Sequence, residues 1–303
     1  MNISSLGLAC FATQYLGYVL LSTYIERAWY ARDHERQRDD AEHENASSST
    51  KSSKIIIIPG KIQPHRAVCG TVRAHADDPW GFPLYQMLFQ RFPRDDGRAT
   101  HPRHRAYASW NLLASALFAF AVGESVARRR SSIYSRDDSR AWCESSEFLD
   151  ALFGFLAATC WQSALEYYWH RAMHARRFYE RFHKIHHFYV SPCVWCDLCI
   201  HPAEAFGYYC VLYSPAWAFP IRDGGFVAYL ALMGVCGVLD HCGIAVKSFG
   251  SVYDTSFHDT HHRTFVFNYA FPFDIMDRAR GTLWRDGVPS TRRRVASART
   301  DTT

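Results

Sequence analysis

The sequence contains no HExxH segment, in which zinc hydrolases combine two helical histidines with a general-base glutamate. A metal-dependent hydrolase of that kind would therefore have no evident base. The formal net charge is only +5 over 303 residues, and the basic residues lie in loops and in a tail that includes Arg292–Arg294. Attraction to lipid headgroups explains such a tail, so we expect no nucleic-acid partner.

A cleaved signal peptide typically has basic residues before its apolar stretch. No basic residue precedes the first apolar run, Ile3–Ile25. We expect this run to remain as an anchor, because it is uncharged and long enough to cross a bilayer as a helix. Four more apolar runs follow, at Ala106–Gly123, Phe148–Trp169, Ala203–Ile221 and Gly224–Val246.

Five such runs predict an all-α fold, an integral membrane helical bundle, rather than a soluble domain. The short segment Arg222–Gly224 separates the last two runs, which we interpret as a helical hairpin. The predicted domains are a membrane anchor (1–25), a polar linker and cytosolic loop (26–105), a membrane-embedded domain (106–290) and a basic disordered tail (291–303).

Ten cysteines do not indicate a disulfide framework here, because several lie within apolar runs, where a free thiol behaves as a small hydrophobic group. Cys193, Cys196 and Cys199 form a CxxCxxC pattern. An iron–sulfur site would need a fourth ligand that the sequence does not offer, so we expect reduced thiols.

The residues that point to a metal site in this sequence are histidines and not cysteines. Three clusters, HRAMH, HKIHH and HDTHH, begin at His170, His183 and His258, and His201 and His241 lie between the last two. Residues three and four apart share a helix face, so each cluster can present two or three imidazoles to one ion. Isolated clusters are often buried core residues or polar loop groups, but three clusters together predict a metal site with two ions.

The apolar runs bring these clusters to one side of the membrane. HRAMH and HKIHH follow the third run, His201 opens the fourth, and HDTHH follows the fifth. Lys and Arg accumulate between Glu26 and Arg105 and again after Arg263, which places those segments in the cytosol by the positive-inside bias. The sequence therefore predicts a cytosolic, histidine-rich helical cap that holds a dinuclear metal site.

These motifs resemble the fatty acid hydroxylase/sterol desaturase superfamily. The resemblance runs from about Phe148 to Trp284 and includes YYWHRAMH, FHKIHH before Ser191-Pro192, the HPAE segment at His201, DHCG at Asp240, and FHDTHHRTFVFNYA. The HPAE segment and the ending with Asp277-Arg278 and Gly281-Thr282 are most similar to the sterol C4-methyl oxidase and cholesterol 25-hydroxylase branches.

The resemblance implies a multi-pass enzyme of the endoplasmic reticulum membrane, with a non-haem di-iron centre facing the cytosol. It implies O2-dependent hydroxylation or desaturation of a lipid such as a sterol or a fatty acyl chain. Electrons would come from NAD(P)H through a separate reductase or cytochrome b5. Because zinc has no redox chemistry, a site that must break an unactivated C–H bond favours iron.

The predicted metal ligands are ten histidines. They are His170, His174, His183, His186, His187, His258, His261 and His262, with His241 as a ninth and His201 as a possible tenth. The residues predicted to orient the rings or balance the charge of the ions are Glu166, Glu204, Asp240, Asp259 and Asn268, with Tyr269 lining the site.

Other functions stay open on the sequence. One is a membrane zinc hydrolase, and another is an inactive scaffold or metal store that keeps the ligands. Within the oxygenase class, a desaturase or a hydroxylase of specialised metabolism is the alternative, because both reactions begin by removing hydrogen from the substrate.

Overall fold

The computed structural model describes residues 3–30, 102–135, 141, 143, 146–188, 192, 194–244, 246–248, 253–285 and 288–289. Within these ranges the chain is mainly helical, and each strand has two residues. The predicted all-α class is confirmed. The middle of the predicted linker, 31–101, and the predicted tail, 291–303, lie outside the described residues.

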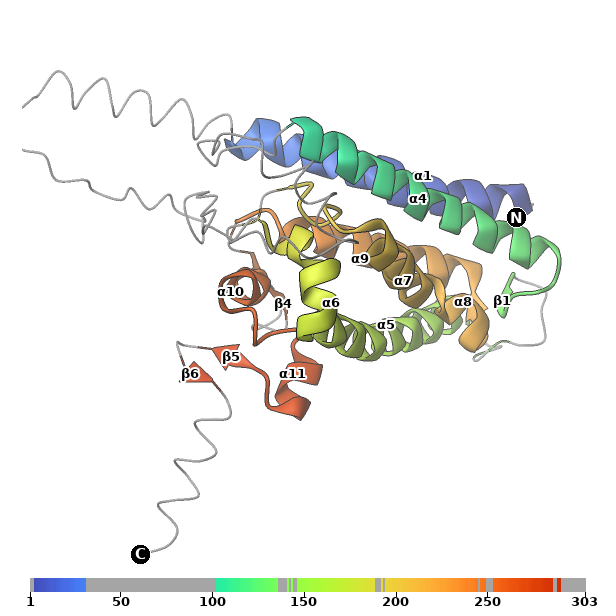
Figure 1. Cartoon of the computed structure of the whole chain (residues 1–303). Helices are drawn as coiled ribbons and strands as arrows, with labels where there is room; N and C mark the ends of the chain where they lie inside the picture. Colours follow the sequence, from blue (N-terminus) through green and yellow to red (C-terminus); the bar gives the residue numbers. More distant parts are fainter. Residues whose placement is uncertain are drawn as a thin grey trace, which may run out of the picture.

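Among the described residues, four helices are long and apolar enough to cross a membrane: α1 (Ile3–Ile25), α4 (Pro102–Ala127), α5 (Glu147–Met173) and α9 (Asp223–Asp240). Figure 1 shows α1 and α4 side by side, and α1 also packs along α9. Large apolar side chains point outward from them, including Leu20 and Trp110, which are 68% and 71% exposed. Apolar side chains that point outward in this way are expected on helices that are surrounded by lipid.

The first helix belongs to the bundle and is not a separate anchor. A π-helical turn, η1 (Glu26–Tyr30), extends α1, and Glu26 forms an ion pair of 2.6 Å with Arg105 near the start of α4. Both ends of the predicted linker 26–105 are therefore helical. The boundary drawn from composition missed this, because polar residues at the end of an apolar helix do not end the helix.

The predicted fourth crossing, Ala203–Ile221, is divided into two shorter helices. α7 (Pro202–Tyr213) has 12 residues, and α8 (Pro215–Ala218) has four. Pro215 has no N–H to continue the α7 hydrogen-bond pattern and starts a new helix instead. At 1.5 Å per residue α7 is about 18 Å long, shorter than the hydrocarbon core of a bilayer.

A short parallel ladder closes the end of the bundle that is far from the histidines. β1 (Ile133–Tyr134) pairs with β2 (Ile221–Arg222), and α9 begins at the next residue. The buried carboxylate of Asp150 accepts hydrogen bonds from Tyr134 Oη and Arg222 Nε, both at 2.7 Å. These contacts explain why an apolar run contains an aspartate.

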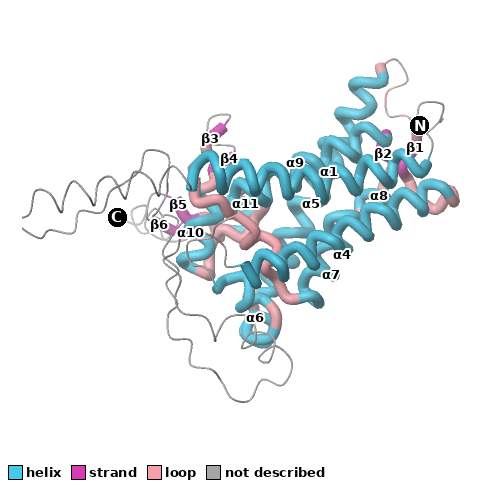
Figure 2. The backbone as a smooth tube through the Cα atoms, turned by 90° about the horizontal axis from the view of Figure 1, so that it is seen from above, coloured by secondary structure: helices cyan, strands magenta, loops and turns pink. Residues whose placement is uncertain are grey.

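The opposite end carries a cap of short elements. They are α6 (Arg176–Arg181), η3 (His183–Phe188), β3 (Lys247–Ser248), β4 (Tyr253–Asp254), α10 (Ser256–Thr264), α11 (Ile275–Arg280), β5 (Trp284–Arg285) and β6 (Val288–Pro289). Figure 2 shows β1 and β2 at one end of the molecule and α10, β5 and β6 at the other. The cap lies where α5 and α9 end and α7 begins, which is where the histidines of the sequence fall.

Candidate metal centre

Nine histidines meet beneath the cap in two groups. In each group the ligand nitrogens all lie within 4.8 Å of one another. The first group is His170, His174, His183, His187 and His261, and the second is His186, His241, His258 and His262. The predicted gathering of distant histidines at one end of the bundle is confirmed.

Each HxxHH cluster contributes to both groups. In η3, the i,i+4 pair His183 and His187 belongs to the first group, whereas His186 belongs to the second. In α10 the i,i+4 pair is His258 and His262 in the second group, and the remaining ring belongs to the first. In the α-helix α10, residues four apart share a face, and the residue between them points elsewhere. Each cluster thus gives two imidazoles to one group and one imidazole to the other.

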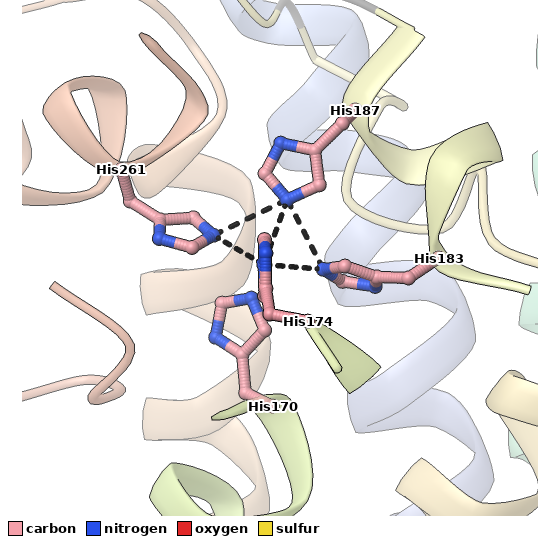
Figure 3. Close-up of side chains that lie close together, drawn as sticks. All are labelled: His170, His174, His183, His187 and His261. Atoms are coloured by element: carbon pink, nitrogen blue, oxygen red, sulfur yellow. Dashed lines mark hydrogen bonds between the residues drawn. The ribbon is translucent and has the colours of Figure 1, made fainter. Parts of the chain in front are cut away.

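The first group combines three elements. His170 lies in the last turn of α5 and His174 caps that helix, so they lie one turn apart. Figure 3 shows their rings meeting those of His183, His187 and His261 at a common centre. His241, just after α9, completes the second group.

Backbone carbonyl groups fix the protons of three rings. Nδ1 of His170 lies 2.8 Å from the carbonyl oxygen of Tyr269, Nδ1 of His261 lies 2.7 Å from that of Phe267, and Nδ1 of His241 lies 2.8 Å from that of Gly237. A carbonyl oxygen only accepts, so each Nδ1 carries the proton. The lone pair of each ring is therefore on Nε2, which faces the centre of its group.

The spacing of the inner nitrogens fits a shared cation. Nε2 of His174 lies 2.9 Å from Nε2 of His183, and 3.1 Å from Nε2 of both His187 and His261. Ligand nitrogens on one ion, with bonds of about 2.1 Å, lie about 3.0–3.4 Å apart. Several lone pairs that converge in this way repel one another unless a positive ion lies between them, so the residues present fit a metal.

Burial keeps these rings neutral. It lowers the pKa of His186, His187, His258 and His261 well below the usual range, and repulsion between neighbouring rings lowers the pKa further. The pKa of His174 is lowered for the same two reasons. Neutral imidazole is the form that binds metal, so the unprotonated groups are ready ligands at physiological pH.

A carboxylate lies near one ring of each group. Glu204, in the first turn of α7, hydrogen-bonds Nδ1 of His183. An oxygen of Asp197 lies 3.8 Å from Nδ1 of His241. No sequence pattern marks Asp197 as a site residue, because it lies inside the CxxCxxC segment, whose pattern points to the thiols. A Cβ on Gly237 would lie 2.7 Å from the Asp197 carboxylate, so the glycine makes room for it.

The segment Phe267–Ala270 positions two rings through its backbone. Asn268 adopts a left-handed conformation, with φ of 58°, between the two residues whose carbonyl groups accept from His261 and His170. Its side chain donates to the carbonyl oxygens of Phe257 and Trp284 and accepts from the Trp284 N–H. Asn268 therefore acts through the backbone and has no hydrogen bond to a ring among the described residues.

Comparison with known proteins identifies this part of the chain. Residues 155–282 match the model of the family described as fatty acid hydroxylase. All nine of the gathered histidines lie inside this range. The chain is therefore similar to this family over about two fifths of its length.

Curated relatives of this region carry names that describe enzymes acting on sterols or on a long-chain aldehyde. The chain is 29% identical over 116 residues to a Delta(7)-sterol 5(6)-desaturase of Gibberella zeae, which covers 38% of this chain and 33% of the relative. It is 31% identical over 130 residues to methylsterol monooxygenase 1 of Gallus gallus, covering 40% and 43%. It is 29% identical over 158 residues to a very-long-chain aldehyde decarbonylase of Oryza sativa subsp. japonica, covering 48% and 60%.

The similarity is confined to part of each relative. The chain spans about a third to three fifths of the length of these three proteins. No solved structure matches the chain significantly. The superfamily inferred from the motifs is confirmed, including a relative from the methylsterol oxidase branch.

Three carboxyl groups that were predicted to support the histidine rings have other partners. Asp240 accepts from Tyr253 Oη at 2.7 Å, and Asp259 lies 3.3 Å from the Arg263 guanidinium. Burial raises the pKa of Asp259 to about 6. Gln162 Nε2 lies 3.5 Å from Glu166. None of the three carboxyl groups has a hydrogen bond to an imidazole among the residues that the structure describes.

His201 lies outside both groups, so we remove it from the proposed ligand set. Its Nδ1 accepts a hydrogen bond from the Ala203 N–H and caps α7, and its ring contacts that of Phe182. The residue before a proline at the first turn of a helix is a natural capping position. The sequence places this histidine near the predicted metal site, but in the structure it caps the start of α7.

A pocket lies beside both histidine groups. Its apolar lining includes Trp169, Ile200, Tyr208 and Phe271, and its polar lining includes histidines of both groups together with Glu166, Asp197 and Glu204. The indole of the half-buried Trp169 lies over Gly207, where an added Cβ would come within 2.2 Å of the ring.

The thiols take no part in either group. Cys196 and Cys199 are fully buried, and they pack with Val194, Val238 and Cys242 in an apolar cluster. Cys193 lies outside the described residues. Among the cysteines that the structure describes, the expected reduced thiols agree with this packing.

Proposed function

We propose that this protein is a membrane-bound, non-haem di-iron oxygenase that acts on a lipid held in the pocket beside the histidines. One observation carries the proposal: nine imidazoles, eight of them buried, form two adjacent groups whose inner nitrogens are spaced as ligands of a metal ion. Because η3 and α10 each contribute histidines to both groups, the two groups would hold two ions close together.

Iron suits the proposed reaction better than other metals that imidazole binds. Imidazole accepts iron, zinc and copper alike, but zinc has no redox chemistry. The names of the relatives describe a desaturase, a monooxygenase and a decarbonylase. When bound, a pair of iron ions supplies the reduction of O2, so that RH, O2, two electrons and two protons give ROH and water.

The residues of this chain hold the ligands and the substrate. Glu204 and the carbonyl groups of Phe267 and Tyr269 fix the orientation and tautomer of His183, His261 and His170. Trp169, Ile200 and Phe271 give the pocket an apolar wall against which a lipid chain or ring system packs. Such a wall keeps water away from the C–H bond that is attacked.

The setting of the enzyme is part of the proposal. We propose that the bundle lies in the endoplasmic reticulum membrane with the histidine cap on the cytosolic side, as the basic loops indicate. Electrons would reach the cap from NAD(P)H through a separate reductase or cytochrome b5. The working unit would be 106–290 together with α1, which packs along α4 and α9.

The test begins with the metal. Full-length protein purified in detergent should contain about two iron ions per chain, and lipid profiles of cells with and without the gene should differ in an O2-dependent product. A gain of one oxygen indicates a hydroxylase, and a loss of two hydrogens indicates a desaturase. Zinc in place of iron, with lipid hydrolysis independent of O2, would indicate a hydrolase instead. A His186→Ala variant that keeps full biological function would indicate a scaffold or metal store.

A further inference from the structure

Glu166 is a carboxyl group in the pocket that the histidines do not use. It lies in α5, one helical turn before His170, and only 8% of its surface is exposed. Its hydrogen bond to Gln162 is long, at 3.5 Å, and the other end of Gln162 accepts from Tyr229. A buried carboxyl group usually has several good hydrogen-bond donors, so this one is poorly satisfied within the protein.

A second carboxyl group faces the same space. Glu204 is 5% exposed and lines the pocket, and its Oε2 has no hydrogen-bond partner, although its Oε1 contacts His183. Asp197 also lines the pocket. Carboxylate oxygens only accept hydrogen bonds. The pocket lining therefore offers one acceptor without a donor, Glu204 Oε2, and a second, Glu166, with one long hydrogen bond, together with the apolar side chains of Trp169 and Phe271.

We propose that Glu166 binds a hydrogen-bond donor of the substrate, so that the pocket selects an apolar lipid that carries a free hydroxyl group. This inference rests on the proposed function and names the substrate class of that site. Side chains one helical turn apart have Cβ atoms about 5–6 Å apart, so a donor held by Glu166 lies close to His170. The carbon that is oxidised is then a near neighbour of the hydroxyl-bearing carbon and not the far end of the lipid.

The competing role for Glu166 is to balance the charge of the metal ions. Measuring metal content separates the two roles. A substrate-binding residue leaves the metal in place when it is replaced, whereas a residue that stabilises the ions does not. The contact with Gln162 rather than with a ring favours the first role.

The experiment compares lipids that differ only in the donor. Binding of hexadecanol and of methyl hexadecyl ether is measured on full-length, iron-loaded protein in detergent, and cholesterol and its methyl ether form a second pair. Losing one hydrogen bond costs roughly 2- to 10-fold in Kd, so at least one alcohol should bind about that much more tightly than its ether.

Two variants assign this preference to Glu166. Glu166→Leu removes the acceptor and should bring the ratio of the two Kd values close to one, with iron content unchanged. Glu166→Gln keeps an acceptor oxygen and should give an intermediate ratio, which keeps the test valid if the leucine variant does not fold. The matched control is Glu180→Gln, which changes an exposed carboxylate on α6 and should keep the wild-type ratio.

Several results would overturn the inference: no preference in either pair, no binding of any of the four lipids, a preference that both Glu166 variants keep, or loss of iron from them. The binding assay needs neither O2 nor electrons. A protein that prefers the alcohols through Glu166 but produces no oxidised lipid would contradict the proposed function and support the binding role of Glu166.

Discussion

The carboxylate of Glu204 hydrogen-bonds Nδ1 of His183 between the first turn of α7 and the start of η3. Both side chains are buried. The contact turns Nε2 of His183 toward Nε2 of His174, 2.9 Å away. A carboxylate behind a ligating imidazole fixes the orientation of the ring and makes it a stronger donor to the metal.

We expect Glu204→Gln to weaken metal retention roughly 10- to 100-fold, because the amide keeps a hydrogen bond to His183 but loses the negative charge. Competition with a chelator on purified protein measures this effect. The exposed Glu180 provides the control variant Glu180→Gln. Equal retention by wild type and Glu204→Gln would show that the carboxylate does not support the ring.

Replacing one histidine should empty only the group to which it belongs. His174→Ala removes a ring from the first group and His262→Ala removes one from the second, so each should lower the iron content from about two ions per chain to about one. The double variant should bind little iron. His201→Ala is the matched control, because that ring caps α7 outside both groups. If the control loses as much iron as the others, the division into two groups is wrong.

Asn268 should be the most sensitive position in the Phe267–Ala270 segment. Asn268→Ala loses three side-chain hydrogen bonds and places an alanine at φ of 58°. We expect a loss of stability on the order of 3–5 kcal/mol, of which about 1–2 kcal/mol comes from the left-handed backbone. Asn268→Gly removes the backbone part and should be less damaging. Thermal unfolding in detergent measures the order, and equal effects of the two variants would exclude backbone strain as a cause.

The metal-free protein should lose stability as the pH falls from about 7 to 5. The folded state lowers the pKa of His186, His187, His258 and His261, whereas the unfolded chain binds protons near its ordinary pKa of about 6.5. Below that value only the unfolded chain gains these protons, so the stability present above it is lost by up to about 1.4 kcal/mol per pH unit and ring.

Thermal unfolding of chelator-treated protein across this pH range checks the expectation. Iron-loaded protein serves as the comparison, because protons must then compete with the metal and the loss should move to lower pH. A melting temperature of the metal-free protein that does not depend on pH would contradict the burial of neutral rings.

Gly207→Ala should disturb the pocket through Trp169. The added Cβ would come within 2.2 Å of the indole, and overpacking of this kind costs about 1–3 kcal/mol. The double variant Gly207→Ala/Trp169→Leu should recover part of this loss, because the smaller side chain leaves space. Gly224→Ala is the control, since nothing lies within 4 Å of a Cβ there. Additive effects in the double-mutant cycle would mean that the two residues do not interact.

The sequence predicted the bundle and the presence of a histidine cluster because both depend on local patterns. Long apolar runs gave α1, α4, α5 and α9, and helical spacing gave the faces on which His170 and His174 lie. The same reasoning did not reveal that Ala203–Ile221 divides at Pro215 or that the linker ends in helix. Whether a helix ends inside an apolar run depends on packing as well as on composition.

Tertiary structure alone decided which ring belongs to which group and which residues support them. His201 fits the motif as well as His241 does, yet only His241 reaches the centre, because the end of α9 turns it inward while the start of α7 uses His201 as a cap. Glu166 is in register with His170 but faces the pocket, whereas Asp197 reaches a ring from an unrelated segment. Spacing fixes the side of a helix on which a residue lies, and only the packing of distant segments fixes what that side meets.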